Sequence, residues 1–396
     1  MRQDKNLSIE GRFLSALTQV LPGERPISLH EPVFSGNDWA YVKECIDTGW
    51  VSSVGKFVDE FEKSIAEITG ARHVVATVNG TSALQIGLNV AGVLPGDEVL
   101  VPALSFVATA NAVSHCGAIP HFVDVSEISL GMDPAVLRDY LQSVTVKRAG
   151  ALCNRESGRK IAAFVPVHAF GHPAQVDELS DISEEFSLPM VEDAAESLGS
   201  YLHGRHTGTT GLCGALSFNG NKIVTTGGGG ALLFSDKGLA DRAKHLTTTA
   251  KKSHRWEFNH DEVAWNYRLP NLNAALGCSQ LERLDDYLTS KRLLAEKYKK
   301  VFLHDPDFRF VVEPKNSKSN YWLSTVALSA PSLSTRNRLL ECANENGFLV
   351  RPAWNLLNKL PMYEHMPSAP LSVAERMSDA LINLPSGSGL IMESEK

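Results

Sequence analysis

Apolar and polar positions alternate in a regular pattern from about residue 72 to residue 234. Short apolar runs predict strands over 73–78, 98–102, 119–123, 161–167, 188–192, 215–218 and 231–234. Apolar residues spaced three or four apart predict helices over 81–92, 106–115, 134–144 and 176–186. Because strands that alternate with helices need crossover connections, we expect an α/β fold with a mostly parallel sheet covered on both faces.

The two ends of the chain have different patterns. An amphipathic stretch over 9–20, followed by Pro22, predicts a helical N-terminal arm over 1–30. Leucines on one helical face predict a connecting helix over 271–300, and predicted strands mixed with one helix follow it. We therefore expect a large α/β domain over 31–270 and a small α+β domain over 301–396.

Composition and charge narrow the class of protein. A chain of 396 residues with 43% hydrophobic content can form two cores, and a net charge of -7 with scattered Lys and Arg argues against a nucleic-acid partner. The six cysteines form no C-x-x-C pair, which favours free thiols in a reducing compartment. The pattern shows neither a signal peptide nor a membrane span, so we expect a cytoplasmic protein that binds no membrane.

Two residues carry the clearest chemical signal. Lys222 ends the segment Ser217-Phe218-Asn219-Gly220-Asn221-Lys222, shortly before a run of glycines, and Asp193 lies at the end of an earlier apolar run. Pyridoxal 5′-phosphate needs two such groups, an amine that forms an imine with its aldehyde and a carboxylate for its pyridinium nitrogen. Taken singly, Lys222 could be a surface lysine and Asp193 could be a helix cap. In a P-loop the lysine is followed by Ser or Thr, so Ile223 argues against a P-loop.

A possible phosphate site precedes these residues in the chain. The segment Asn79-Gly80-Thr81-Ser82 joins a predicted strand to a predicted helix, so its N–H groups and two hydroxyls face a common point that suits a phosphate. Ser217 offers a further hydroxyl. An ordinary capped helix is the alternative. Phe106 offers a ring to stack on the pyridine, although a lone Phe is more often a core residue.

His168 and His172 have the spacing of a zinc-binding pair. Gly171 and Pro173 make a helix improbable there, so we predict no metal site. We expect one or both histidines to line the cleft instead.

Together these segments resemble the sugar aminotransferases of the DegT/DnrJ/EryC1/StrS family, from about Ile27 to the C-terminus. The matching motifs are Glu192-Asp193-Ala194-Ala195, Ser217 to Lys222 with the tail Thr225-Thr226-Gly227, Asn79 to Leu84, and Trp265-Asn266-Tyr267-Arg268-Leu269. The resemblance implies a pyridoxal phosphate enzyme of fold type I. It also implies a homodimer with shared active sites.

The resemblance assigns functions to single residues. It implies that Lys222 bonds to the cofactor's aldehyde and that Asp193 pairs with the pyridinium, which makes both catalytic. The implied cofactor-binding residues are Gly80, Thr81, Ser82, Phe106, Asp193, Glu196, Ser217, Lys222, Asn266 and Arg268. Among them, Asn266 and Arg268 would reach the cofactor of the neighbouring subunit. The expected substrate contacts are Trp50, Ser52, His168 and Tyr321.

Segments 31–36 and 47–53 look most like one branch of the family. That branch aminates C4 of UDP-linked 4-keto-6-deoxy-N-acetylhexosamines, which lead to bacillosamine or legionaminic acid in surface polysaccharides such as O-antigen. The resemblance therefore implies transfer of an amino group from L-glutamate to such a ketosugar. Amination at C3 and a non-catalytic regulator that binds the cofactor are the alternatives, while Lys222 argues against a dehydratase.

Overall fold

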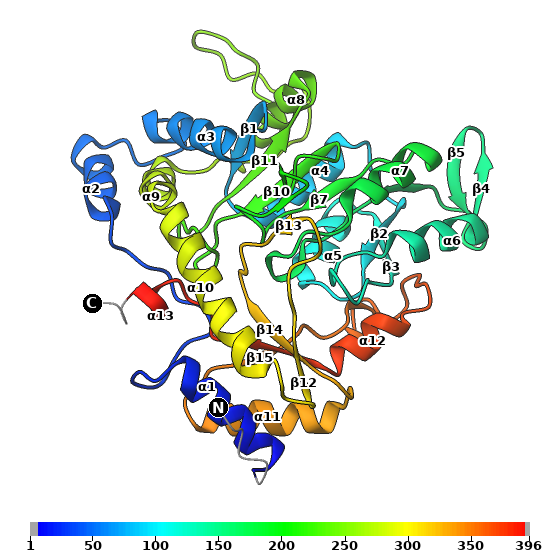
Figure 1. The fold of residues 1–396 in the computed structure, drawn as a ribbon. Coiled ribbons are helices and arrows are strands. Elements are labelled where there is room, and N and C mark those ends of the chain that lie inside the picture. The colour runs from blue at the N-terminus through cyan, green and yellow to red at the C-terminus, as the bar shows by residue number, and fades with distance from the viewer. Residues whose placement is uncertain (1–6, 393–396) are drawn as a thin grey trace.

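The computed structural model describes residues 7–392, so residues 1–6 of the predicted arm and 393–396 of the predicted small domain lie outside it. The upper part of the molecule in Figure 1 contains the expected alternation of strands and helices. Its main strands are β1 (His73–Thr77), β2 (Glu98–Pro102), β3 (Ile119–Val123), β6 (Ile161–Phe164), β7 (Val191–Asp193), β10 (Cys213–Ser217) and β11 (Gly230–Phe234). The helices between them are α4 (Gly80–Val90), α5 (Val107–His115), α6 (Pro134–Val144) and α7 (Val176–Phe186).

The strands form two sheets, in the orders β3-β2-β6 and β1-β11-β10-β7. Parallel bridges from Phe164 to Met190 and from Val167 to Asp193 link β6 to β7 and join the two sheets. All pairs are parallel except those of β11, which runs antiparallel to both β1 and β10. The expectation of a mostly parallel sheet is therefore confirmed.

Local sequence explains where several elements begin. All five residues of β2 are buried, as a strand covered on both faces requires. Helix α6 begins where the side chain of Asp133 accepts a hydrogen bond from the amide of Val136 and Pro134 occupies the first turn. These signals are local, and for this reason the predicted and observed bounds of α6 agree.

The structure differs from the sequence-based elements in several places. The polar stretch 147–160 contains a hairpin of β4 (Thr145–Arg148) and β5 (Ala151–Asn154), in which Gly150 at φ +83° allows the turn. The predicted connecting helix is two helices, α9 (Asn271–Glu282) and α10 (Leu284–Phe302), separated at Arg283. Helices α2 (Asp38–Thr48), α3 (Lys56–Thr69) and α8 (Lys237–Thr247) were not predicted.

The C-terminal part forms a separate antiparallel sheet in the order β12-β14-β16-β15. Its strands are β12 (Phe308–Phe310), β14 (Ser324–Leu328), β15 (Arg351–Pro352) and β16 (Leu381–Leu384), and its main helix is α11 (Leu333–Glu345). Helix α1 (Ile9–Val20) packs on α10 and α11 with Phe13 and Leu17 fully buried, so the N-terminal arm lies in the lower part of Figure 1. This packing explains why one face of the helix over 9–20 is apolar.

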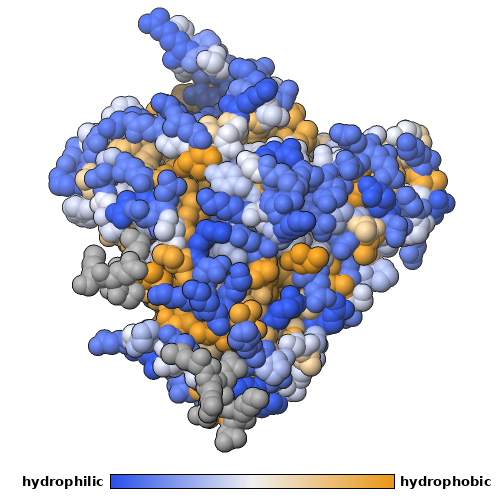
Figure 2. Space-filling view, viewed as in Figure 1, coloured by the Kyte–Doolittle hydropathy of each residue, from blue (hydrophilic) through white to orange (hydrophobic). Residues whose placement is uncertain are grey.

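The remaining elements connect or close these parts. A small sheet of β8 (Tyr201–Leu202), β9 (Arg205–His206) and β13 (Ser317–Lys318) pairs the large part with the C-terminal part. Short helices are η1 (Ala169–Gly171), η2 (Leu357–Lys359), α12 (Ser372–Ser378) and α13 (Gly389–Met392). Hydrophobic residues gather on the face drawn in Figure 2 along the course of α9 and α10. None of the helices within residues 7–392 has the length and apolar composition needed to cross a membrane.

Candidate active site

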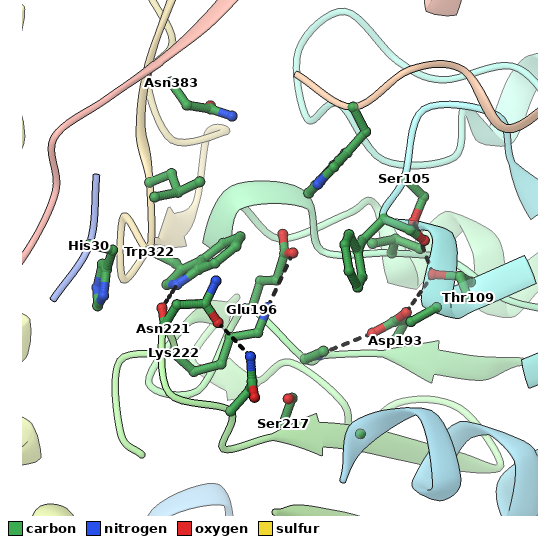
Figure 3. A pocket seen from close by; sticks show the side chains of 18 of the residues that line it. His30, Ser105, Thr109, Asp193, Glu196, Ser217, Asn221, Lys222, Trp322 and Asn383 are labelled. Atoms are coloured by element: carbon green, nitrogen blue, oxygen red, sulfur yellow. Dashed lines mark hydrogen bonds and ion pairs between the residues drawn. The ribbon is translucent and has the colours of Figure 1, made fainter. Parts of the chain in front are cut away.

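A cavity of about 680 Å³ lies at the carboxyl ends of β2, β7 and β10, where parallel sheets place their ligands. The large part contributes seven residues that the sequence singled out: Gly80, Thr81, Phe106, Asp193, Glu196, Ser217 and Lys222. The N-terminal segment and the C-terminal part close the other side with His30, Trp322, Arg351 and Asn383. In Figure 3, His30 and Trp322 lie on the side of the cavity opposite Asp193 and Thr109.

Asp193 is a buried carboxylate without a cationic partner. Its side chain is 5% exposed, Oδ2 accepts a hydrogen bond of 2.8 Å from the Thr109 hydroxyl, and Oδ1 accepts one of 3.2 Å from the Ala195 amide. No Lys, Arg or His nitrogen of the described residues lies within 4.0 Å of it. Burial raises the pKa of Asp193, while these hydrogen bonds and the charge of Lys222 oppose the rise. A cationic ligand group would therefore be favourable at this end of the cavity.

The amine of Lys222 lies between a carboxylate and an aromatic face. Its Nζ is 3.4 Å from Glu196 Oε1 and 3.8 Å from the centroid of the Trp322 ring. Glu196 is fixed because its Oε2 accepts a hydrogen bond from the Phe170 amide, and Trp322 is fixed because its indole N–H donates to the carbonyl of Asn221. Burial raises the pKa of Glu196, and the charge of Lys222 counteracts this.

The beginning of α4 forms the third side of the cavity. The Asn79 side chain accepts a hydrogen bond from the Ser82 amide, which fixes the first turn, while Gly80 and Thr81 face the cavity next to Ser217. A Cβ atom on residue 80 would lie 2.8 Å from the Cβ of Ser217, so only glycine permits this close approach. The first N–H groups of a helix lack acceptors within the helix, and the N-terminus favours anions. Ser82 itself is buried and does not line the cavity.

These groups fit pyridoxal 5′-phosphate. The unpaired carboxylate of Asp193 matches a protonated ring nitrogen, and the amine of Lys222 matches an aldehyde. The start of α4 with Ser217 matches a phosphate. Phe106 lines the same cavity and is 51% exposed, which leaves its ring free to contact a ligand.

Four other predicted residues lie away from this cavity within one chain. Trp50 lines a second hollow of about 420 Å³ together with Cys45 and Asn271, and Ser52 lies on the exposed loop beside it. Asn266 is exposed and Arg268 is partly buried, and neither lines the cavity that contains Lys222. None of the four lines the cavity that contains Lys222 in this chain.

His168 and Tyr321 are not placed as expected for substrate contacts. The His168 ring is fully buried, with Nε2 2.9 Å from a Glu192 carboxylate oxygen and Nδ1 accepting a hydrogen bond from the Ala174 amide. Both ring nitrogens are therefore occupied within the protein. The Tyr321 hydroxyl accepts a hydrogen bond from the Glu313 amide, and neither residue lines the cavity. The geometry does not support direct substrate contact for either residue.

The structure adds residues that sequence reasoning missed. Thr109 lies one helical turn after Phe106, and Trp322 directly follows Tyr321, so spacing along the chain offered a signal for both. His30, Arg351 and Asn383 reach the cavity from segments far apart in the sequence. Nothing in their local sequence indicated a shared site.

Comparison with known proteins identifies the family. The sequence model described as the DegT/DnrJ/EryC1/StrS aminotransferase family matches residues 34–396. The GDP-perosamine synthase of Caulobacter vibrioides is 34% identical over 367 residues, 92% of this chain and 94% of that protein. EpsN of Bacillus subtilis, a proposed pyridoxal phosphate-dependent aminotransferase, is 34% identical over 377 residues, 94% and 93% of the two chains. The aminotransferase TlmJ from Streptoalloteichus hindustanus superposes with a TM-score of 0.82 at 29% identity, covering 91% of this chain and 93% of that one.

The comparisons confirm fold type I and the use of pyridoxal phosphate. They do not single out the bacillosamine or legionaminic acid branch, because these relatives are a GDP-perosamine synthase and EpsN. The match over 34–396 and the shared architecture lead to one conclusion: the chain belongs to the DegT/DnrJ/EryC1/StrS family of pyridoxal phosphate-dependent sugar aminotransferases.

Proposed function

We propose that the protein transfers an amino group from L-glutamate to C4 of a nucleotide-linked 4-keto-6-deoxy sugar. The observation that carries this proposal is that Lys222, Asp193 and the start of α4, which suits an anion, line one cavity. Relatives named GDP-perosamine synthase support a nucleotide-linked amino sugar as the product class. The resemblance of segments 31–36 and 47–53 to the C4 branch supports the position of amination.

Asp193 and the start of α4 would hold the two ends of the cofactor. When bound, pyridoxal phosphate supplies a carbonyl that takes up an amino group and a ring that withdraws electrons from the adjacent carbon. Asp193 would keep a proton on the ring nitrogen, since no other cation of the described part of the chain contacts its buried carboxylate. Gly80, Thr81 and Ser217 would bind the phosphate through N–H and hydroxyl donors.

Lys222 is the base that fits proton transfer in this cavity. Its side chain is 11% exposed, so water has little access to the amine. As a free amine, Nζ would take the proton from the substrate carbon bonded to nitrogen and return it to the carbon on the other side of that nitrogen. The Glu196 carboxylate, 3.4 Å away, and the Trp322 ring would hold that amine in position. Phe106 would cover a face of the cofactor ring.

We also propose a homodimer in which each subunit completes the other's site. Large apolar side chains are exposed on α2 and the loop after it, where Trp39 is 74% and Trp50 is 58% exposed. The segment 248–266 projects beyond α8 at the top of Figure 1 and exposes Trp256 and Phe258. A second copy of the chain would cover these surfaces and offer Arg268, whose guanidinium has no carboxylate within 4.0 Å in the described part, to its partner.

The proposal is tested with purified protein, L-glutamate and 4-keto-6-deoxy sugars linked to UDP and to GDP. We expect 2-oxoglutarate and an aminosugar to form in equal amounts, with NMR of the product placing the new amine on C4. Lys222→Ala should abolish turnover and the visible absorbance of the cofactor-loaded protein. A product aminated at C3 would change the proposed position of amination from C4 to C3. Cofactor binding without turnover of any ketosugar would favour a regulator.

A further inference from the structure

A buried lysine lies behind the wall of the cavity formed by the N-terminal and C-terminal segments. Lys291 of α10 is 1% exposed, and its Nζ donates to the carbonyl oxygens of Trp322 at 3.0 Å and Ser386 at 2.5 Å. The third neighbour of Nζ is His30 Nε2 at 2.9 Å. No carboxylate among residues 7–392 lies within 4.0 Å of this amine, so its positive charge meets only neutral acceptors.

The contact with Lys291 determines which nitrogen of the His30 ring carries the hydrogen atom. A protonated lysine amine donates three hydrogen bonds and accepts none, so whenever Lys291 is protonated His30 Nε2 is the acceptor and Nδ1 carries the ring hydrogen. His30 Nδ1 is buried and has no hydrogen-bond partner in the described part of the chain, and His30 lines the cavity that contains Lys222. A buried donor without an acceptor is unfavourable, so an acceptor atom of a ligand would stabilise it.

The charge on the same wall indicates which acceptor fits. Arg351 also lines the cavity, and outside the lining its Nη1 donates to the Asn344 side chain and to the carbonyl of Val350, both neutral groups. No carboxylate of the described residues lies within 4.0 Å of its guanidinium. Among the described residues, Lys291 thus contacts His30 without an anionic partner, and Arg351 adds a second positive charge without one to the lining of the same cavity. Burial lowers the pKa of Lys291 to about 7, and a bound anion would raise it again.

We infer that His30 Nδ1 donates a hydrogen bond to an anionic oxygen of the substrate, with Lys291 as the positioning residue that holds its tautomer. The inference rests on the proposed function, which requires two ligands with such oxygens. One is the carboxylate of the amino donor, and the other is the diphosphate of the nucleotide sugar. Both offer the same chemistry to this N–H group.

Direct binding to the cofactor-loaded enzyme separates the two sources. Calorimetric titration uses glutarate as the carboxylate probe and UDP or GDP as the diphosphate probe, with wild type, His30→Phe and His30→Asn. Loss of a hydrogen bond to a charged group should weaken one probe roughly 10- to 100-fold in His30→Phe. His30→Asn places an amide N–H near the position of Nδ1 and should restore much of the affinity. Lys291→Met should weaken the same probe, and His365→Asn, with its side chain 88% exposed, should weaken neither.

Each result decides the inference. Selective loss of glutarate binding assigns His30 to the amino donor, and selective loss of UDP or GDP binding assigns it to the nucleotide sugar. Kinetics should then show a raised KM for that substrate with a nearly unchanged kcat, which general damage to the fold would not produce. Unchanged affinities in His30→Phe, or no binding of either probe to wild type, would overturn the inference. A wild type that binds a probe but aminates no ketosugar would instead contradict the proposed function.

Discussion

At the residue scale, Asp193 combines deep burial with the lack of a contacting cation among residues 7–392. Its carboxylate is held by Thr109 and the Ala195 amide, so its position does not depend on its charge. We predict that Asp193→Asn keeps the fold, because the two side chains are nearly isosteric. The half-reaction with glutamate should slow by orders of magnitude, since an amide holds a ring proton poorly. Stopped-flow absorbance measures this rate, and a near-normal rate with an unchanged circular dichroism spectrum would reduce Asp193 to a structural residue.

His172 offers a residue-scale prediction about stability and pH. Both ring nitrogens are buried without hydrogen-bond partners in the described residues, and the ring packs edge-on against Tyr321. Burial lowers its pKa from 6.5 to about 4. Because the unfolded chain then binds the proton more readily, the protein should lose stability as the pH falls from 6.5 towards 4.

His172→Phe removes this proton site and keeps a ring of similar shape. Between pH 7.5 and pH 5 the variant should lose less stability than wild type, by roughly 2 kcal/mol at most. Thermal melting at the two pH values gives the comparison, with the exposed His365→Asn as control. Equal losses in wild type and His172→Phe would show that this ring does not titrate on unfolding.

At the element scale, the start of α4 depends on its close approach to the end of β10. Gly80 is the contact point, since a Cβ there would lie 2.8 Å from Ser217 Cβ and 3.4 Å from the carbonyl oxygen of Leu216. Gly80→Ala should therefore push the first helical turn away from Ser217 and weaken pyridoxal phosphate binding by about tenfold or more. Equilibrium dialysis of the cofactor measures this change.

Gly23→Ala is the matched control, because a Cβ at residue 23 meets nothing within 4 Å. The control should leave cofactor affinity and melting temperature unchanged. If Gly80→Ala binds the cofactor as tightly as the control does, the phosphate is held elsewhere. The same result would remove the start of α4 from the proposed site.

At the scale of the whole molecule, the proposed dimer predicts that two defective subunits can complement each other. Lys222→Ala lacks the amine, and an Asn266→Ala, Arg268→Ala double mutant would lack the residues offered to the partner's cofactor. A mixed dimer would hold one site free of both defects. Random exchange gives about half mixed dimers with one intact site of two, so activity near a quarter of wild type is expected.

The mixing experiment needs two preliminary measurements. The double mutant must itself be nearly inactive, and subunit exchange must be shown with differently tagged chains. If both parents are inactive and exchange occurs, a mixture that stays inactive would place the whole site within one chain. Sedimentation of the wild type tests the dimer independently of activity.

Much of the large part follows from local sequence. The bounds of β2, β3, α6 and α7 were predicted because periodicity, caps and turn residues act within a few positions. Helices α3 and α8 have local signals that were missed, because Phe57, Phe61 and Ile65 recur on one buried face of α3 and the Asp236 side chain caps the first turn of α8. Helix α2 has no side-chain cap and few buried residues. Lys222 and Asp193 were found because each follows an apolar strand, which brings both to one edge of the sheet.

The sequence by itself therefore determined the alternating fold and the half of the site that the sheet carries. Only the tertiary structure decided the other half. His30 and Trp322 reach the cavity through the packing of the N-terminal segment and the C-terminal part against α10, and no local pattern records such contacts. Arg351 reaches it from β15, beside α11. The tertiary structure likewise showed that the buried ring of His168 contacts Glu192. The sequence did not indicate this contact, because burial and hydrogen-bond partners depend on residues far away in the chain.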